Sequence, residues 1–462
     1  MGHNFKLIPQ KTDNIQTNYR EIKTYLPCPS SIDYINKLFK YEPLSMNNQI
    51  PVLWDKAEGF NVWDLDGNKF IDLTSTIFVT NAGHGIGKNS LLENIQKPLL
   101  NSYYYPTVQR AKFSEFIIEN LIGENYNNNF KKVLFLSTGS EAMEASMKMA
   151  KLNFINKKGN HENYIIGFEN SFHGKTLGSQ MAGGKTKDKK WLEKSTGGGY
   201  FHLPYPYPWV LKEKNMSGEE FFNDSISKMT KEFINKISAF VFEPYQGWCA
   251  VFFPKDYMQA LYKFCKENNI LLISDEIQSG FGRTGKLFAF EHYDIVPDMI
   301  VCGKAISGNL PVSAVISRED LFGTDESFNS THGGNPLAMS SALENLKFLL
   351  DNDLVKKSEE LGVFLFDYLK KWKEEEILIT DFYSKGLLAS VFLKSPISEI
   401  NNIDFVDDII ERAYRKGVIS IRTCSGTLKI GPPLIITKEA LIESLDAYKE
   451  CIKEFKNEHN IS

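Results

Sequence analysis

Two short apolar runs, each leading to an ionisable side chain, constrain the fold of this chain more than any other feature. Residues 270–273 lead to Asp275, and residues 299–302 lead to Lys304. Apolar runs of this length predict buried strands of an α/β sheet. Ligands of open α/β sheets bind outside the carboxyl ends of the strands. The segment therefore predicts an acid and a lysine at one ligand-binding edge, although a structural salt bridge would use the same two residue types.

The residues between these runs carry a long and specific motif. Asp275 opens the sequence DEIQSGFGRTG, and Lys304 follows the next apolar run. This pattern resembles the lysine region of class III aminotransferases, enzymes that depend on pyridoxal 5′-phosphate (PLP), and motifs across residues 50–440 resemble the same family. The resemblance implies the fold type I PLP-transferase architecture. That α/β fold has a large, mainly parallel-sheet domain with helices on both faces, and a smaller α+β domain from the two chain ends.

The chemistry of PLP explains why an acid and a lysine are wanted. A lysine amine binds the aldehyde of PLP, and an acid beside the ring nitrogen of PLP keeps that nitrogen protonated. The resemblance assigns the internal aldimine to Lys304 and the ring nitrogen to Asp275, as the catalytic pair. It implies an aminotransferase that moves an amino group between an amine or amino-acid donor and a keto or aldehyde acceptor. An amino-acid racemase or epimerase on the same scaffold would use both residues identically, and this alternative stays open.

A second motif suits a phosphate group. The apolar run 133–136 leads into the tight turn STGSEA and then a helical pattern, and the first amides of a helix bind phosphate well. The family counterpart of this turn binds the cofactor phosphate, which implies contacts from Gly139 and Ser140. Motifs after other strands imply further cofactor contacts from Phe172, His173, Glu243, Ile277 and Gln278.

A third motif bears on assembly. Residues 331–336 read THGGNP and resemble the family motif whose threonine binds the phosphate of the neighbouring subunit. The resemblance therefore implies a homodimer with shared active sites, to which Thr331 contributes. A local alternative is that Thr331 caps a helix beginning near Pro336, because proline is favoured at the first helical position.

Five positions bear on the substrate. Ile77 and Phe78 match a family segment that lines the substrate pocket, although both would also serve as core residues. Lys175 and Lys429 stand where members using glutamate or γ-aminobutyrate have arginines, and Trp248 stands where those members have a glutamate. Lysine cannot replace the bidentate fork of arginine on a carboxylate. We therefore expect a bulkier or less acidic amine than the family's usual donors.

The domain boundaries follow from these motifs. Residues 1–85 are expected to form an N-terminal arm and a hairpin around Asp66-Gly67, as part of the small domain. Residues 86–340 form the expected large PLP-binding domain, and residues 341–462 complete the small one. The glycine-, lysine- and proline-rich residues 183–220 are predicted to form an ordered surface loop, because proline at alternate positions opposes regular structure.

Composition limits the partners. The net charge is −4 with no long basic run, which argues against nucleic acid or an anionic membrane as a partner. No segment approaches the length of a membrane-spanning helix, and the first residues lack the apolar core of a signal peptide. The six cysteines form no CxxC pair, and the histidines show no metal-ligand spacing. The expected protein is cytoplasmic, holds no metal, and binds small molecules and a second copy of itself.

Overall fold

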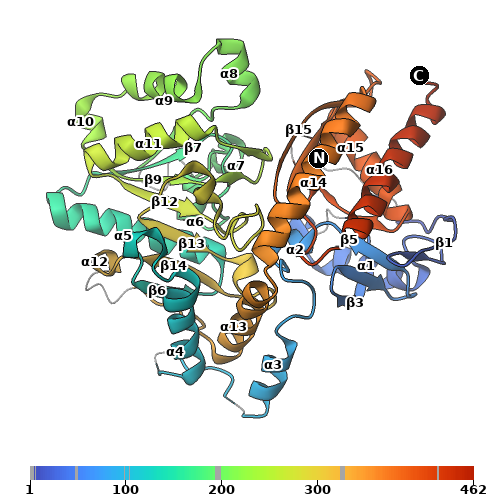
Figure 1. The fold of residues 1–462 in the computed structure, drawn as a ribbon, viewed down its shortest axis with the longest axis horizontal. Helices are drawn as coiled ribbons and strands as arrows, with labels where there is room; N and C mark the ends of the chain where they lie inside the picture. Colours follow the sequence, from blue (N-terminus) through green and yellow to red (C-terminus); the bar gives the residue numbers. More distant parts are fainter. Residues whose placement is uncertain are drawn as a thin grey trace. The chain divides into compact units, whose positions relative to one another are not determined.

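The computed structural model describes residues 5, 7–46, 50–97, 99–103, 105–192, 199–322, 328–423 and 426–461. The chain forms two compact units (Figure 1). The larger unit contains residues 86–356, and the smaller unit combines residues 1–85 with residues 357–462. The predicted α/β fold is confirmed, because the larger unit contains a sheet of mostly parallel strands and the smaller one draws on both chain ends.

A seven-stranded sheet forms the centre of the larger unit. Its strand order is β6-β14-β13-β12-β9-β7-β8, and only β14 runs antiparallel to its neighbours. Every residue of the inner strands β9, β12 and β13 is buried, and most are apolar, because both faces of the sheet are covered. The strands are β6 (Lys132–Leu136), β7 (Tyr164–Phe168), β8 (Tyr200–Leu203), β9 (Ile237–Phe242), β12 (Leu271–Asp275), β13 (Met299–Cys302) and β14 (Ser313–Ser317).

Helix α5 (Gly139–Lys158) packs on the sheet through one apolar face. Met143, Met147 and Ala150 recur at helical spacing, and all three are buried against strand residues such as Ile273 and Val301. Helices α3, α4 and α13 lie against one another elsewhere in the unit, and α9 lies along α11 (Figure 1). These helices are α3 (Lys88–Ile95), α4 (Val108–Glu115), α9 (Gly218–Ser227), α11 (Lys255–Asn268) and α13 (Pro336–Asp351).

Shorter elements complete the larger unit. A small hairpin pairs β10 with β11, and brief helical turns follow several strands. They are η3 (Phe116–Ile122), η4 (Asn125–Asn128), α6 (Leu177–Ala182), α10 (Lys231–Ile234), β10 (Tyr245–Gln246), β11 (Val251–Phe252), η5 (Ala289–Tyr293), η6 (Lys304–Ile306) and α12 (Glu319–Phe322).

The prediction of a surface loop at residues 183–220 is wrong for much of that segment. It contains α7 (Thr186–Lys189), the edge strand β8 and α8 (Pro208–Lys214), while residues 193–198 lie outside the described residues. Pro208 occupies the first turn of α8, where its missing N–H and fixed φ do no harm. Proline therefore marked the start of a helix here rather than its exclusion.

The smaller unit holds two sheets with helices packed against them. In the first sheet, the hairpin of β4 and β5 encloses Gly67 at φ +78°, which confirms the predicted turn at Asp66-Gly67. Its strands are β1 (Ile15–Gln16), β2 (Glu21–Ile22), β3 (Trp54–Glu58), β4 (Asn61–Asp64), β5 (Lys69–Asp72) and β17 (Val418–Ile419). The second sheet contains β15 (Ile379–Lys385), β16 (Leu388–Leu393), β18 (Ile421–Thr423) and β19 (Thr427–Ile430).

The helices of the smaller unit come from both ends of the chain. They are η1 (Pro29–Ser31), α1 (Ile32–Tyr41), η2 (Leu44–Met46), α2 (Ser75–Phe78), α14 (Leu354–Glu375), which begins just before the boundary, α15 (Asn402–Arg415) and α16 (Lys438–Glu458).

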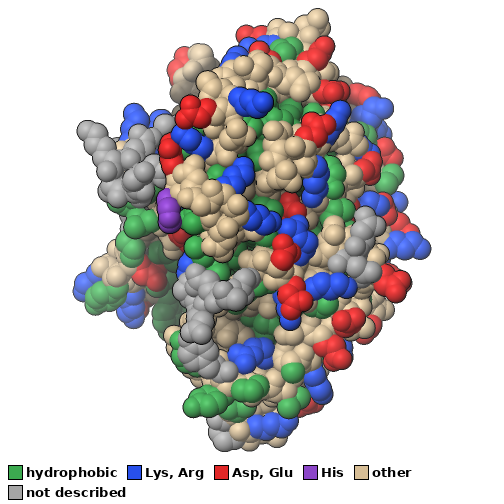
Figure 2. Space-filling model, turned by 90° about the vertical axis from the view of Figure 1, so that its left-hand side faces the viewer, with side chains coloured by type: hydrophobic (Ala, Val, Ile, Leu, Met, Phe, Trp, Pro, Cys, Tyr) green, Lys and Arg blue, Asp and Glu red, His purple; other side chains and the backbone are tan. Residues whose placement is uncertain are grey.

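The surface carries both signs of charge. On the face drawn in Figure 2, lysine and arginine side chains are interspersed with aspartate and glutamate, in keeping with the net charge of −4. No helix within the described ranges is long and apolar enough to cross a membrane. Those same ranges contain no group of three or more histidine, cysteine, aspartate or glutamate side chains placed to hold a metal ion.

Candidate active site

Asp275 and Lys304 leave the large sheet at the same edge. Strands β12 and β13 are parallel neighbours, with Asp275 in register with Val301, and Lys304 begins the turn η6 just beyond β13. Lys304 has φ +44°, a left-handed conformation that non-glycine residues seldom adopt. Such conformations persist where the surroundings fix them, and they cluster at functional sites. The sheet thus brings the predicted acid and lysine to one ligand-binding edge.

The Asp275 carboxylate is buried and held on both oxygens. Its Oδ2 lies 2.8 Å from Nδ1 of His173, and its Oδ1 accepts the backbone N–H of Ile277 at 3.1 Å. His173 comes from the loop after β7, so two strand ends converge here. The buried Nε2 of His173 has no hydrogen-bond partner within the described part of the chain.

Glu243 occupies a second buried position in the same cluster. Its carboxylate accepts the backbone N–H of Phe172 at 2.8 Å and that of Gly247 at 3.0 Å. Burial raises the pKa of Glu243 to about 7, an effect that the charge of His173 opposes and that of Asp275 reinforces. A Cβ on Gly247 would lie only 2.6 Å from Oε1 of Gln278, so Gln278 belongs to this cluster too.

The amine of Lys304 is tuned toward its neutral form. Burial lowers the pKa of Lys304, while the nearby carboxylates of Asp275 and Glu243 oppose that effect. A lysine with a lowered pKa carries more neutral amine near neutral pH, and neutral amine is the form that attacks carbonyls and accepts protons. The cluster can therefore supply a nucleophile and a general base.

The predicted phosphate turn faces the same cluster. Thr138 caps α5 together with Glu141 in a capping box, which leaves Gly139 and Ser140 in the first turn. A Cβ on Gly139 would lie 2.9 Å from Cδ1 of Ile277, so only glycine fits without a shift. The N-terminal amides of α5 therefore stand beside the end of β12 and carry the partial positive charge that attracts an anion.

These residues fit PLP. The cluster offers a neutral-tending amine, a held carboxylate and a helix N-terminus for phosphate, and the ring of Phe172 is 37% exposed between buried neighbours. The unpartnered Nε2 of His173 supplies one more polar atom for a ligand. When bound, PLP supplies an electron sink for the reacting carbon. Lys304 would hold its aldehyde, and Asp275 would face its ring nitrogen.

The five predicted substrate residues divide between the units. In the larger unit, Lys175 is exposed, while Trp248 is half-buried with the ammonium of Lys185 over its ring. In the smaller unit, Phe78 is buried and Ile77 is 43% exposed.

Lys429 completes the set in the smaller unit. It is buried, and its Nζ lies 4.8 Å from the ring centroid of Phe78. Sequence reasoning missed Lys185, because a lysine within a lysine-rich segment carries no pattern that sets it apart.

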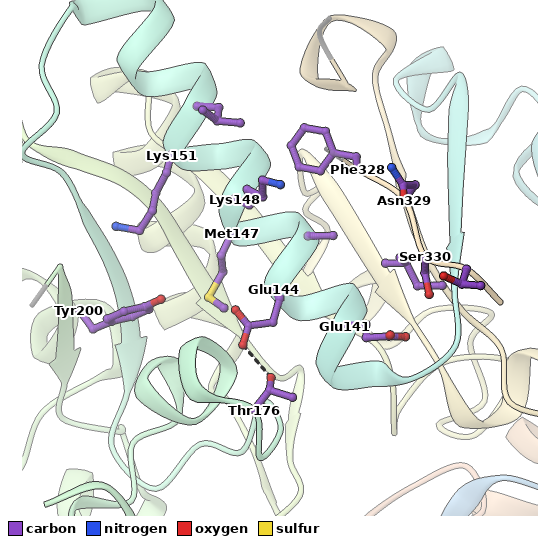
Figure 3. Close-up of a pocket in the computed structure, with 14 residues that line it drawn as sticks. Glu141, Glu144, Met147, Lys148, Lys151, Thr176, Tyr200, Phe328, Asn329 and Ser330 are labelled. Carbon is purple, nitrogen blue, oxygen red and sulfur yellow. Dashed lines mark hydrogen bonds between the residues drawn. The ribbon is translucent and has the colours of Figure 1, made fainter. Parts of the chain in front are cut away.

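Thr331 does not cap the helix that follows it. The cap of α13 is Asn335, whose side-chain oxygen accepts the N–H groups of Leu337 and Ala338 at 3.0 and 3.2 Å. The capping interpretation of Thr331 is therefore wrong, although Pro336 does open the helix. Thr331 is exposed and helps to line a pocket of about 780 Å³ beside α5. Figure 3 shows this pocket, with Ser330 across from the helix.

Comparison with known proteins decides the family. The family model described as aminotransferase class-III matches residues 44–452. The chain belongs to the class III aminotransferase family. The ornithine aminotransferase of Plasmodium yoelii yoelii is 32% identical, over 92% of this chain and 96% of its own length. The acetylornithine aminotransferase of Methanocaldococcus jannaschii is 30% identical, over 92% of this chain and 100% of its own length.

A solved structure agrees. The ornithine aminotransferase from Toxoplasma gondii ME49 aligns with a TM-score of 0.79 and 26% identity, covering 95% of this chain and 97% of its own. The class III enzyme described here is accordingly a PLP-dependent aminotransferase, acting on an amine donor and a keto acceptor. Of the two activities that the sequence left open, transamination is supported and racemisation is not.

Proposed function

We propose that Lys304 and Asp275 are the catalytic residues of this aminotransferase. The observation that carries the proposal is their emergence at one sheet edge, with the pKa of Lys304 lowered by burial. Lys304 accepts and returns a proton at the substrate carbon that bears the amino group, and Asp275 is held in place by His173. The proposed cofactor contacts are Gly139, Ser140, Phe172, His173, Glu243, Asp275, Ile277, Gln278 and Lys304. All of them fall within residues 86–340, the proposed PLP-binding domain, and within the compact unit of residues 86–356.

We also propose a homodimer with shared active sites, in which Thr331 reaches the phosphate of the partner's cofactor. Thr331 is exposed and is not needed to cap α13. Exposed apolar side chains on and between α3 and α4 are typical of an interface: Leu92, Ile95, Leu99, Leu100, Tyr105 and Val108. A second copy of the chain would remove this surface from water.

We propose that the amino donor needs less binding of a carboxylate group by the enzyme than ornithine, acetylornithine or 4-aminobutyrate, the substrates after which the relatives are named. Lys175 and Lys429 each offer a single charged donor where an arginine would offer a fork. A hydrogen bond to a charged group contributes about 1.5–3 kcal/mol, so losing one favours less acidic amines by roughly 10-fold or more. Ile77, Phe78 and Trp248 are proposed to supply the apolar contacts.

A reducing compartment, the cytoplasm, is proposed from the thiols. Four buried cysteines in the described part of the chain carry free thiols: Cys28, Cys265, Cys302 and Cys451. Free thiols of this kind are usual where glutathione keeps cysteines reduced.

A half-reaction tests the proposed donor class. The holoenzyme is mixed with single donors and no acceptor, and the absorbance of the bound cofactor is followed as it converts to its aminated form. The panel contains L-ornithine, N-acetyl-L-ornithine, 4-aminobutyrate, L-lysine and putrescine. We expect putrescine or lysine to react at least as fast as 4-aminobutyrate. A clear preference for 4-aminobutyrate would contradict the argument from the missing arginines, and a Lys304→Ala variant that still converted would overturn the catalytic assignment.

A further inference from the structure

Four consecutive residues of the smaller unit have left-handed backbone. Ser75, Thr76, Ile77 and Phe78 have φ values of +48°, +53°, +58° and +67°. In this region Cβ crowds the following carbonyl oxygen, so L-residues other than glycine enter it singly and not in runs. Contacts around the run must therefore over-determine it, and strained backbone of this kind is concentrated at functional sites.

One buried carboxylate holds a residue just before the run and a residue that follows it in the chain. Asp72 is fully buried, and its Oδ1 accepts both the backbone N–H and the hydroxyl of Thr74, at 2.7 and 2.6 Å. Oγ1 of Thr74 in turn accepts the N–H of Thr76 at 3.1 Å. Oδ2 of Asp72 lies 2.8 Å from Nε2 of His84. One carboxylate thus ties the residue before the run to a residue beyond it.

The other side of the run rests on β19 and the turn after it. The N–H of Gly431 donates to the carbonyl of Leu73 at 2.8 Å, and the hydroxyl of Ser75 donates to the carbonyl of Gly431 at 2.7 Å. Any Cβ on Gly431 would overlap the ring of Phe78. Lys429 places its ammonium over that same ring. Phe78 is therefore packed against glycine backbone and is also covered by a cation.

The run exposes one apolar side chain, Ile77, and buries the next, Phe78. Phe78 is inaccessible to water, whereas Ile77 remains largely exposed and helps to line a pocket of about 210 Å³ with Ile410 and Arg422. An exposed isoleucine removes little apolar area from water, so its burial does not offset the free energy of the strained conformation. The arrangement is explained if the conformation serves to present Ile77 to a ligand.

We propose that Asp72 and His84 are positioning residues, which hold the left-handed run so that Ile77 contacts the aliphatic part of the amino donor while Phe78 anchors the run from below. This inference rests on the proposed function, since it takes Ile77 as a substrate contact. A pre-set apolar surface spares the enzyme the cost of ordering a loop when the donor binds. Neither positioning residue touches the reacting atoms.

The first test is Thr76→Gly, which releases the run. Glycine adopts positive φ without strain, so we expect an unchanged or higher Tm. We also expect a KM for the donor about tenfold higher, comparable to losing one methylene contact, with kcat and cofactor absorbance retained. Asn269→Gly is the matched control. Asn269 caps α11 at φ +54°, so this variant relieves the same kind of strain and leaves KM unchanged.

The second test is Asp72→Asn, which keeps the shape but leaves a single oxygen to serve both Thr74 and His84. We expect the same rise in KM, together with faster hydrogen exchange of the amides of residues 74–80 in the apoenzyme, a readout that needs no activity. The donor is the fastest of the panel above. Wild-type KM values in both variants would overturn the inference while leaving the proposed function intact. A wild type that converts no donor would instead overturn the proposed function and this inference with it.

Discussion

Asp275→Asn offers the most informative perturbation of the proposed catalytic pair. The substitution keeps one oxygen to accept the N–H of Ile277, now at 3.1 Å, but removes the charge that faces Nδ1 of His173 at 2.8 Å. A hydrogen bond to a charged group contributes about 1.5–3 kcal/mol. At about 1.36 kcal/mol per factor of ten, the loss corresponds to roughly 10- to 150-fold in rate. Asp275→Ala leaves His173 without its partner, and removing one member of a buried pair costs about 3–5 kcal/mol. If that free energy is lost from the transition state, the rate falls by about two to nearly four orders of magnitude.

The assay is the single-turnover half-reaction of cofactor-saturated enzyme with the best donor, monitored by absorbance, with PLP affinity measured separately by titration of the apoenzyme. Asp298→Asn is the control. Asp298 is equally buried, precedes β13 at the opposite end and pairs with Arg318, so its loss lowers stability without touching the site. The reasoning is refuted if Asp275→Asn, fully loaded with PLP, turns over at the wild-type rate, or if Asp298→Asn slows turnover as much.

Three further perturbations follow from the same geometry. Gly139→Ala should weaken PLP binding by about tenfold or more, because the new methyl would lie 2.9 Å from Cδ1 of Ile277 and one displaced phosphate contact is worth about 1.5–3 kcal/mol. Titration of the apoenzyme with PLP measures the affinity, and an unchanged affinity would contradict phosphate binding at the start of α5. Thr331→Ala should likewise reduce PLP affinity by about tenfold while Thr331→Ser does not; equal affinities of the two variants would remove Thr331 from the phosphate site. Burial raises the pKa of Glu276 from 4.5 to about 7, so the folded protein holds a proton that the unfolded chain releases within this window. The free energy of unfolding should then fall as pH rises from 4.5 to 7, by up to about 1.4 kcal/mol per pH unit, and Glu276→Gln should flatten that slope in urea titrations.

Local pattern was enough to define the strands and turns that hold the proposed active-site residues. The apolar runs before Asp275 and Lys304 became β12 and β13, and the turn at Gly139 became the capped start of α5. These features depend on short-range rules: apolar runs form buried strands, and a threonine followed by a glutamate three residues later caps a helix. The proline-rich segment failed because the same rules allow proline at the first turn of a helix, as at Pro208.

Tertiary structure alone decided how these pieces act on one another. Nothing in the sequence pairs His173 with Asp275, which are brought together because β7 and β12 end at the same edge of one sheet. The lowered pKa of Lys304 comes from burial, a property of the packed fold and not of neighbouring residues in the chain. The left-handed run at Ser75–Phe78 also lacks a sequence signal, because it contains no glycine and exists through contacts with Asp72 and Gly431. Sequence determines which groups are available, whereas long-range packing sets their distances, charges and strain.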